Sequence, residues 1–347
     1  MNARSAYVDL TQRHRAAGLF TVEGSSTHLP MALGALLGLG APAEVLHRFA
    51  AGYVTRLPPA PPRSLTPVNT GREAHAAFGQ SGRYADLLAF FSAEIERDGA
   101  LRVQAEWLDE LLQSPASTAF HSLIRFAYGR RFDHPGEIAS GLADLASQRR
   151  LLAPPEGDGL PITDALTQLL AARTLVETDW QQPPISQRLR EVAASHEFKR
   201  TCAPLVMSAT DVPTVLDALC GASIDKYLSG MSFTALHLVT ACHALRIVLP
   251  ALGDAPAALR AFWPAWAAAW VVARVVACGT PAQRGCGEVE KTAAEAAVDW
   301  PALVARTLGS DDDHVIKMVF TCKEEHERSG DLRYPRAAAR LLAIGHS

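Results

Sequence analysis

The chain has few aromatic residues and no long stretch in which apolar and polar residues alternate. Phe, Trp and Tyr make up 7 % of its 347 residues, whereas apolar residues as a class reach 48 %. Its core must therefore be built mostly from alanine, leucine and valine, a composition that favours packed helices over sheets. A half-buried strand would show a period of two, and that period is missing. The sequence predicts an all-α protein.

Basic stripes and cysteine motifs are also missing. The net charge is −3 with 20 % charged residues, so nucleic acid is not expected as a partner. None of the cysteines has Cys-x-x-Cys spacing, and together they do not form the dense framework of a small secreted domain. We expect reduced, buried thiols. The six cysteines are Cys202, Cys220, Cys242, Cys278, Cys286 and Cys322.

Long, uninterrupted apolar runs do not occur either. The first residues, Met1 to Ser5, lead into polar sequence rather than into the apolar core of a signal peptide. The most apolar stretch, 261–273, contains Pro264 and is followed by Arg274. It falls short of the roughly 20 apolar residues that a membrane span requires. We expect a buried helix there and a cytoplasmic protein without a membrane partner.

What the sequence does contain is helical periodicity along nearly its whole length. Proline-rich and glycine-rich segments at 57–62 and 152–159 separate the helices. We expect a single large helical domain over residues 1–347, with many antiparallel helices around a buried metal site. Helices are predicted over residues 6–17, 28–37, 42–49, 84–96, 101–112, 117–128, 137–150, 162–175, 185–194, 212–227, 232–249, 256–277, 288–308, 312–328 and 334–344.

Four histidines and one lysine lie in stretches whose neighbours predict buried helix. Such surroundings do not tolerate imidazoles or an amine without partners. One such histidine alone is more often a hydrogen-bonded core residue, but their number favours a shared metal ion. An amine in an apolar pocket also loses its proton readily. The five residues are His28, His121, His237, His314 and Lys317.

His314 and Lys317 are three residues apart and therefore face one pocket. The acidic run before them, residues 311–313, is interpreted as the start of a helix, where carboxylates cap free N–H groups. His243 competes with His237, but six positions on a helix separate their directions by about 120°, so only one of them faces a common site. We expect the remaining histidines that lie beside charged or turn residues to be solvated: His47, His75, His134, His196 and His326.

These segments resemble the questin oxidase-like family, and the resemblance spans nearly the whole chain. The similar segments are residues 28–33 with 39–41, 120–124 with Tyr128, 236–240 with 243–246, and 314–317 with the closing helix at 334–342. In two places the chain departs from the family: Arg125 stands where relatives often carry a second histidine, and Thr27 replaces an asparagine. Substrate identity therefore does not transfer.

The resemblance implies a helical oxygenase that performs Baeyer–Villiger-type oxidation or ring cleavage on a polycyclic aromatic or quinone-like substrate. It implies a mononuclear nonheme Fe(II), with dioxygen as co-substrate, held by four histidines and a carboxylated lysine. On this chain the lysine is Lys317, and three of the histidines are His28, His121 and His237. We choose His314 as the fourth, with His243 as the alternative.

The same resemblance suggests further roles. Arg125, Tyr128 and Arg246 are candidates for contact with the substrate or for support of the ligands, although both arginines could instead be ordinary ion-paired residues. NADPH is a candidate reductant, as for some relatives. The chain has no phosphate loop to mark it, because the Gly-x-Gly-x-x-Ala match at 38–43 follows no strand and is better explained as a helix stop.

Two other classes of function stay open. A helical scaffold or binding protein would keep the histidines for packing and hold no metal. A zinc-dependent hydrolase would need a general base, and carboxylates are scarce near the predicted ligands. No pattern in the sequence indicates an oligomeric state.

Overall fold

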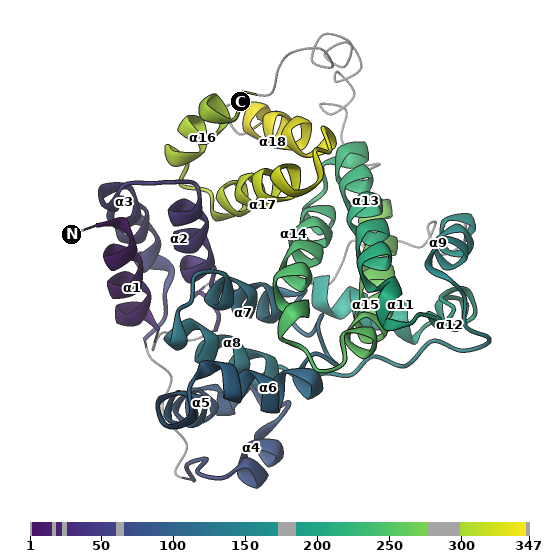
Figure 1. The fold of residues 1–347 in the computed structure, drawn as a ribbon, viewed down its shortest axis with the longest axis horizontal. Helices are drawn as coiled ribbons and strands as arrows, with labels where there is room; N and C mark the ends of the chain where they lie inside the picture. The colour runs from purple at the N-terminus through teal and green to yellow at the C-terminus, as the bar shows by residue number, and fades with distance from the viewer. Residues whose placement is uncertain are drawn as a thin grey trace.

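A computed structural model describes residues 2–15, 19–22, 26–59, 66–172, 185–276 and 299–344. Within these ranges the chain forms helices joined by short loops, as Figure 1 shows, and no β-strand. The described part contains two isolated bridges, between Phe20 and Ser26 and between Leu160 and Leu205. The predicted all-α class is confirmed.

In the first half of the chain, helices α1 to α8 form one side of the molecule, with α1 to α3 at one end and α4 to α8 beside them, whereas α9 lies apart from this group (Figure 1). The helices of the first half are α1 (Ala3–His14), α2 (Leu29–Gly38), α3 (Ala43–Tyr53), η1 (Val54–Arg56), α4 (Gly71–Ala77), η2 (Ser81–Arg83), α5 (Tyr84–Asp98), α6 (Ala100–Leu111), α7 (His121–Arg131), α8 (Pro135–Ser147) and α9 (Ile162–Ala171).

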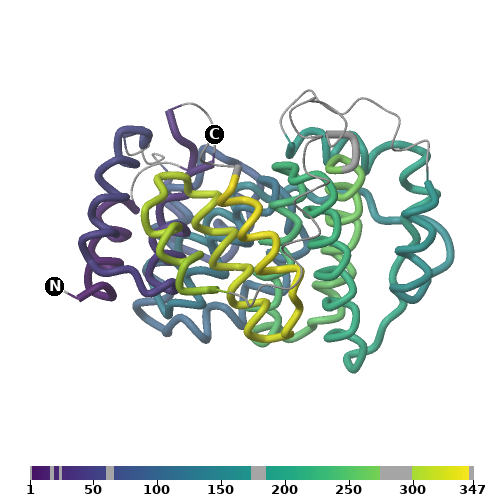
Figure 2. Tube along the Cα trace, turned by 90° about the horizontal axis from the view of Figure 1, so that it is seen from above, coloured from purple at the N-terminus to yellow at the C-terminus, as the bar shows by residue number. Residues whose placement is uncertain are grey.

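Helices of the second half bring the C-terminal part of the chain back against the first half. Helix α17 packs on α2 and α14, and α14 packs on α7; both views show α9 and α12 at the end opposite α1 (Figures 1 and 2). They are α11 (Ile185–Ala194), α12 (His196–Thr201), η3 (Ala209–Asp211), α13 (Val212–Gly230), α14 (Phe233–Val248), η4 (Leu249–Ala251), α15 (Ala255–Val276), α16 (Trp300–Leu308), α17 (Asp313–Ser329) and α18 (Arg333–Ile344).

Most predicted helices are present, and the differences have local causes. Helix α7 begins at His121 instead of 117, because Ala119 and Phe120 have left-handed φ angles of 53° and 68° that a right-handed helix excludes. Helix α2 ends at Gly38 as expected, and Gly40 follows with φ 81°. The short helices α4 and α12 were not predicted. Parts of the predicted helices at 162–175 and 288–308, and also Cys278 and Cys286, lie outside the described residues.

The apolar stretch at 261–273 is a buried helix, as predicted. It lies within α15, where the fully buried rings of Trp263 and Trp266 stack 5.8 Å apart. Their indole N–H groups donate to Ala203 O at 2.8 Å and to Ser223 Oγ at 2.9 Å. Both of these buried indole N–H groups therefore have an acceptor, as a well-packed core requires.

One other stretch, Phe233–Ala251, is long and apolar enough to cross a membrane, but 72 % of its most apolar window is buried inside the protein. It contains α14, which packs between α7, α13, α15 and α17, so we interpret it as a core helix. The four cysteines in the described part are buried with free thiols, as predicted: Cys202, Cys220, Cys242 and Cys322.

His134 is buried rather than solvated, which corrects the prediction for this residue. Its Nε2 lies 2.7 Å from Thr11 Oγ1. Its Nδ1 accepts a hydrogen bond from the Glu137 backbone N–H at 3.3 Å, so the ring caps the start of α8. Residues of α1 cover the ring, because Tyr7 packs edge-on against it with the ring centroids 5.4 Å apart and Thr11 contacts its Nε2.

Candidate metal centre

The structure brings the four predicted histidines together near the N-terminal ends of four helices. His28 directly precedes α2, His121 is the first residue of α7, His237 lies near the start of α14, and His314 is in the first turn of α17. The ring centroids are 4.6 Å apart for His28 and His121, 4.6 Å for His28 and His314, 4.8 Å for His121 and His237, and 5.7 Å for His237 and His314. Segments almost 300 residues apart in sequence thus form one cluster.

The helix starts that carry these rings are held by local interactions. Ser232 caps α14 by accepting from Ala235 N at 3.2 Å, and Asp312 caps α17 by accepting from His314 N at 2.8 Å. His28 occupies the cap position of α2 without making a side-chain cap. Its backbone N–H donates to Tyr53 Oη at 2.8 Å, and its ring is left to point into the cluster.

The hydrogen bonds of His121 and His237 settle where their protons are. His121 Nδ1 lies 2.5 Å from Thr118 O, and His237 Nδ1 lies 2.7 Å from Phe233 O. A carbonyl oxygen only accepts, so both Nδ1 atoms carry hydrogen and a neutral ring has its lone pair on Nε2. Burial, together with the neighbouring histidines, lowers the pKa of both rings well below the usual value.

The two Nε2 atoms of this pair nevertheless face each other at 3.1 Å. With both rings neutral, neither atom has a proton to donate, and two lone pairs at this distance repel. Imidazole nitrogens bind a metal ion at about 2.1 Å. If two of them bind one ion with a nitrogen–metal–nitrogen angle of about 90°, they lie about 3.0 Å apart. The pair therefore has the spacing that a shared cation requires.

In His28 and His314, Nδ1 also lies beside an oxygen atom, but this oxygen belongs to a carboxylate and not to a backbone carbonyl. Their Nδ1 atoms lie 2.6 Å and 2.9 Å from Asp313 Oδ1. Within the described part of the chain, the buried Nε2 atom of each ring has no hydrogen-bond partner. Ligand nitrogens of His28, His121 and His314 lie within 4.8 Å of one another. A histidine whose Nδ1–H is held by a carboxylate is the usual arrangement behind a metal ligand.

Asp313 is the functional residue that the sequence interpretation missed. The acidic run was assigned to helix capping, which is right for Asp312 and wrong for Asp313, a residue that is only 3 % exposed. Burial alone would raise its pKa, but His28, His314 and Lys317 lower it far below the usual range. A signal was present: Asp313 precedes Lys317 by four residues, one helical turn, and a buried amine needs an acid.

Lys317 lies on the same side of the cluster, with Nζ 3.7 Å from Asp313 Oδ1 and 3 % of the residue exposed. Burial lowers its pKa to about 8, although Asp313 and Asp312 act in the opposite direction. The neutral amine is thus accessible near neutral pH. It is the form that can add CO₂ and become an anionic oxygen ligand.

His243, the alternative fourth ligand, is engaged elsewhere. Its Nε2 lies 3.1 Å from Glu324 Oε2 and its Nδ1 lies 3.1 Å from Glu325 Oε1. Burial alone would lower its pKa, but the two carboxylates raise it to about 9. The ring is therefore a buried imidazolium in an ion pair, and it offers no lone pair to a metal ion.

The three candidates for substrate contact do not line the cavity at the histidines. Arg125 Nε donates to Glu137 Oε2 at 3.2 Å, and Arg246 Nε donates to Glu325 Oε1 at 3.0 Å. The ring of Tyr128 packs in the apolar core. Both arginines are thus ion-paired residues, which was the alternative to a role in substrate binding. The positions of the three residues give no support to a contact with the substrate.

A cavity of about 690 Å³ opens directly onto the cluster. Its described lining combines histidines, two phenylalanines and three arginines with small polar residues: Phe20, Ser26, His28, Arg56, Ser117, Thr118, Ala119, His121, Gln148, Arg150, Ile185, Ser186, Arg190, Phe233 and His314. This volume suits a small organic molecule. The three arginines were not singled out from the sequence, because no local pattern marks them.

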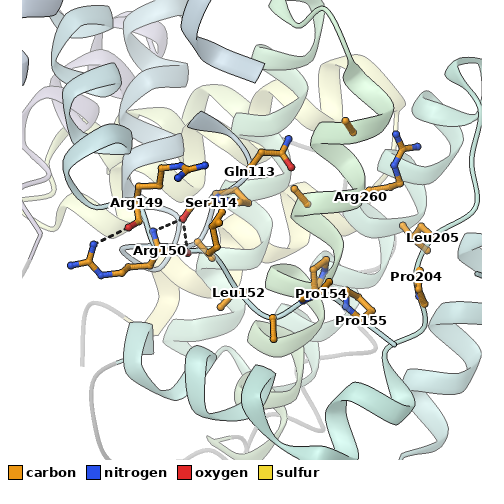
Figure 3. A pocket seen from close by; sticks show the side chains of 17 residues that line it. Gln113, Ser114, Arg149, Arg150, Leu152, Pro154, Pro155, Pro204, Leu205 and Arg260 are labelled. Atoms are coloured by element: carbon orange, nitrogen blue, oxygen red, sulfur yellow. Dashed lines mark hydrogen bonds between the residues drawn. The ribbon is translucent and has the colours of Figure 1, made fainter. Parts of the chain in front are cut away.

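A second cavity, of about 480 Å³, shares only Arg150 with the first among its described lining residues. Figure 3 shows it between Gln113, Arg260 and the prolines Pro154, Pro155 and Pro204. The described residues around it include no histidine, cysteine or carboxylate. It offers no donor set for a metal ion, so the histidine cavity is the candidate functional site.

The sequence is similar to fungal oxidases over part of its length. A Baeyer-Villiger oxidase of Paecilomyces divaricatus is 29 % identical over 149 residues, covering 40 % of this chain and 32 % of the relative. Questin oxidases of Aspergillus terreus and Aspergillus fumigatus are both 28 % identical, over 130 and 116 residues, covering 35 % and 31 % of this chain and 29 % and 26 % of the relatives. The matched segments thus span about a third or less of each relative's length.

The sequence model of one protein family, described as Questin oxidase-like, matches residues 25–322. That range includes all four clustered histidines, Asp313 and Lys317. The chain belongs to the questin oxidase-like family.

Proposed function

We propose that this protein is a metal-dependent oxygenase that acts on an aromatic small molecule, with one nonheme Fe(II) bound by His28, His121, His237, His314 and a carboxylated Lys317. The observation that carries the proposal is the 3.1 Å approach of two Nε2 lone pairs, those of His121 and His237. Further support comes from the relatives, which are named as questin oxidases and a Baeyer-Villiger oxidase.

The charge balance of the site favours an anionic fifth ligand. Four neutral imidazoles bring no charge, and the helix ends that carry them are the positive ends of the helix dipoles. A divalent cation in this place needs negative charge nearby. Asp313 supplies one carboxylate behind the ligands, and a carbamate on Lys317 would supply an oxygen ligand. Imidazole and anionic oxygen suit Fe(II), which would supply the activation of dioxygen when bound.

The residues of this chain hold and orient the reactants. Asp313 keeps the protons of His28 and His314 on Nδ1, so that both Nε2 atoms stay available. The cavity receives the substrate against Phe233, whose ring lies 4.6 Å from the rings of both His237 and His314. A bound aromatic molecule would exclude water from the cluster, which protects reactive oxygen species from side reactions.

The overall reaction inserts one atom of dioxygen beside a ring carbonyl carbon. The second oxygen atom leaves as water and requires two electrons and two protons. NADPH is our proposed source of these electrons. The substrate is proposed to be an aromatic, quinone-like compound of the polyketide type, by analogy with the relatives named as questin oxidases.

Asp313 is the buried carboxylate at this cluster that a hydrolase could use as a base, but its properties disfavour that role. A general base works best with a pKa near the working pH. Three neighbouring donors hold the pKa of Asp313 far below its usual range, despite burial. Its oxygen is moreover occupied by two imidazole N–H groups. These properties of Asp313 favour an oxygenase over a hydrolase at this site.

Elemental analysis of protein purified without oxygen tests this proposal. We expect about one iron per chain, and oxygen uptake that requires the iron, an aromatic ketone and NADPH together. His121→Ala and His237→Ala should lose the iron, whereas His47→Gln, outside the cluster, should retain it. Full oxygenase activity without any metal, or bound zinc with hydrolysis of the substrate, would overturn the proposal.

A further inference from the structure

The cavity at the histidines carries an excess of positive charge. Three arginines from different elements line it: Arg56 at the end of η1, Arg150 after α8, and Arg190 in α11. Among the described lining residues there is no aspartate or glutamate. A bound molecule in this cavity therefore lies in a positive field, which attracts anions.

The three guanidinium groups differ in how they are held. Arg56 Nη1 lies 3.5 Å from Asp313 Oδ2, so part of its charge is already matched. Arg150 donates through Nη1 to Gly79 O and to Arg149 O, both uncharged carbonyls. For Arg190, the structure contains no hydrogen bond or ion pair to any described residue. Arg150 and Arg190 thus keep a positive charge that no described carboxylate neutralises.

Two exposed aromatic rings line the same cavity. Phe20 is 38 % exposed and Phe233 is 51 % exposed, and both are among the few large apolar side chains at the surface. Apolar surface that gathers at a cavity in this way marks a binding site. Phe233 also lies against two rings of the cluster, so a flat ligand on Phe233 would be next to the proposed metal.

We propose that the substrate of this site is a planar aromatic compound with an anionic oxygen group, a carboxylate or an acidic phenol. Its ring packs on Phe233 and Phe20, and its anionic group pairs with Arg150 and Arg190. The proposal rests on the proposed function, to which it adds the charge of the substrate. The cluster histidines lie deeper than the two arginines, which are exposed to solvent. The ligand is therefore oriented with its anionic group toward solvent and its ring toward the histidines.

Paired ligands that differ only in charge test this inference by calorimetric titration of the full chain with its metal. One pair is 2-naphthoate and 2-naphthamide; the second is ionised 4-nitro-1-naphthol and its methyl ether, which separates a carboxylate preference from a phenolate preference. We expect at least one anion to bind about tenfold more tightly than its neutral analogue. Arg190→Gln and Arg150→Gln should remove most of that preference, and Arg190→Lys should restore part of it.

Arg102→Gln is the matched control, because Arg102 is exposed on α6 and lines neither cavity. It should leave the preference unchanged. Equal binding of the charged and neutral members of both pairs would overturn the inference. So would a preference that survives both arginine variants and disappears in His121→Ala, because the anion would then bind the metal and not the arginines.

Iron content, measured on the same samples, separates this inference from the proposed function. The arginine variants should keep their iron, since neither arginine lies among the proposed ligands. Iron without any preference for anions would overturn the inference alone. A clear preference in a protein that binds no iron would overturn the proposed function and leave the inference standing.

Discussion

The positions of four protons decide what the histidine cluster can do. Each imidazole gives its Nδ1–H to an oxygen: the carbonyls of Thr118 and Phe233 hold two, and the carboxylate of Asp313 holds the other two. All four Nε2 lone pairs therefore remain for a common cation. Asp313 is central to this arrangement because it fixes two rings at once.

Replacing Asp313 with Asn should weaken metal binding by roughly 10- to 100-fold. Asparagine keeps the shape but loses the charge, and its amide cannot accept two N–H groups on one oxygen as strongly as a carboxylate does. Competition with a fluorescent chelator measures the affinity. Asp311→Asn, an exposed neighbour, is the control and should bind metal as the wild type does. Equal loss in both variants would contradict the role of Asp313.

Replacing Lys317 with Ala should lower metal affinity by at least about tenfold, since the proposed carbamate oxygen is lost. Added acetate or propionate should restore part of the binding by placing a carboxylate in the vacated space. Native mass spectrometry should detect one CO₂ on the wild type and none on the variant. Lys323→Ala, on the same helix but paired with Glu327, should change neither property. A wild type that carries no CO₂ would contradict the carbamate.

The N-terminal ends of four helices position the histidines of the cluster. The residues before one of these helices, α7, have a backbone conformation that L-residues rarely adopt. Ala119 and Phe120 have φ angles of 53° and 68° directly before α7, a conformation that costs about 1–2 kcal/mol per residue. Ala119 also lines the cavity. Such strain beside a site is retained when the surrounding structure requires it. Here it directs His121 toward the cluster.

Replacing Ala119 with Gly should raise the free energy of unfolding by about 1 kcal/mol, because glycine accepts a positive φ without a steric cost. The same change should weaken metal binding, since the turn before His121 becomes more flexible. Urea denaturation and chelator competition measure the two effects. Ala105→Gly, at an exposed position inside α6, should instead destabilise the protein by about 1 kcal/mol. Destabilisation by both changes would argue against strain at Ala119.

The sequences of these helices reveal some residues of the site and hide others. Buried histidines within apolar helices are visible in sequence, so the four clustered histidines could be predicted, and the structure places His314 rather than His243 among them. Asp313 could not be separated from the capping residue Asp312 without knowing which of them faces inward. Arg125 and Tyr128 lie one and two turns beyond His121 on α7, and each turn carries a residue about 5 Å away from the cluster.

At the scale of the molecule, one hydrophobic core of the described residues extends from α1 to α18, and His28 and His237 are buried with it at 4 % and 2 % exposure. This core holds His28, His121 and His237 neutral. Burial, with the charge of Lys317, lowers the pKa of His28 from 6.5 to about 3. The core therefore opposes protonation of the cluster and makes the fold sensitive to acid.

The free energy of unfolding of metal-free protein should therefore fall as the pH is lowered from 6.5 toward 3. In this window the unfolded chain binds protons on these histidines that the folded chain does not bind, so stability rises with pH. Each histidine contributes about 1.4 kcal/mol per pH unit within its window. Urea denaturation at several pH values measures the slope, which His237→Phe should reduce. An unchanged slope in that variant would contradict the burial of a neutral imidazole.

The proposed centre requires a single cation between His121 and His237. Anomalous diffraction at the iron absorption edge, from crystals of the iron-loaded protein, tests it directly. We expect one peak about 2.1–2.2 Å from Nε2 of each of the four histidines, with an oxygen carried by Lys317 as a further ligand. A peak elsewhere in the molecule, or no peak in protein shown to contain iron, would contradict the account.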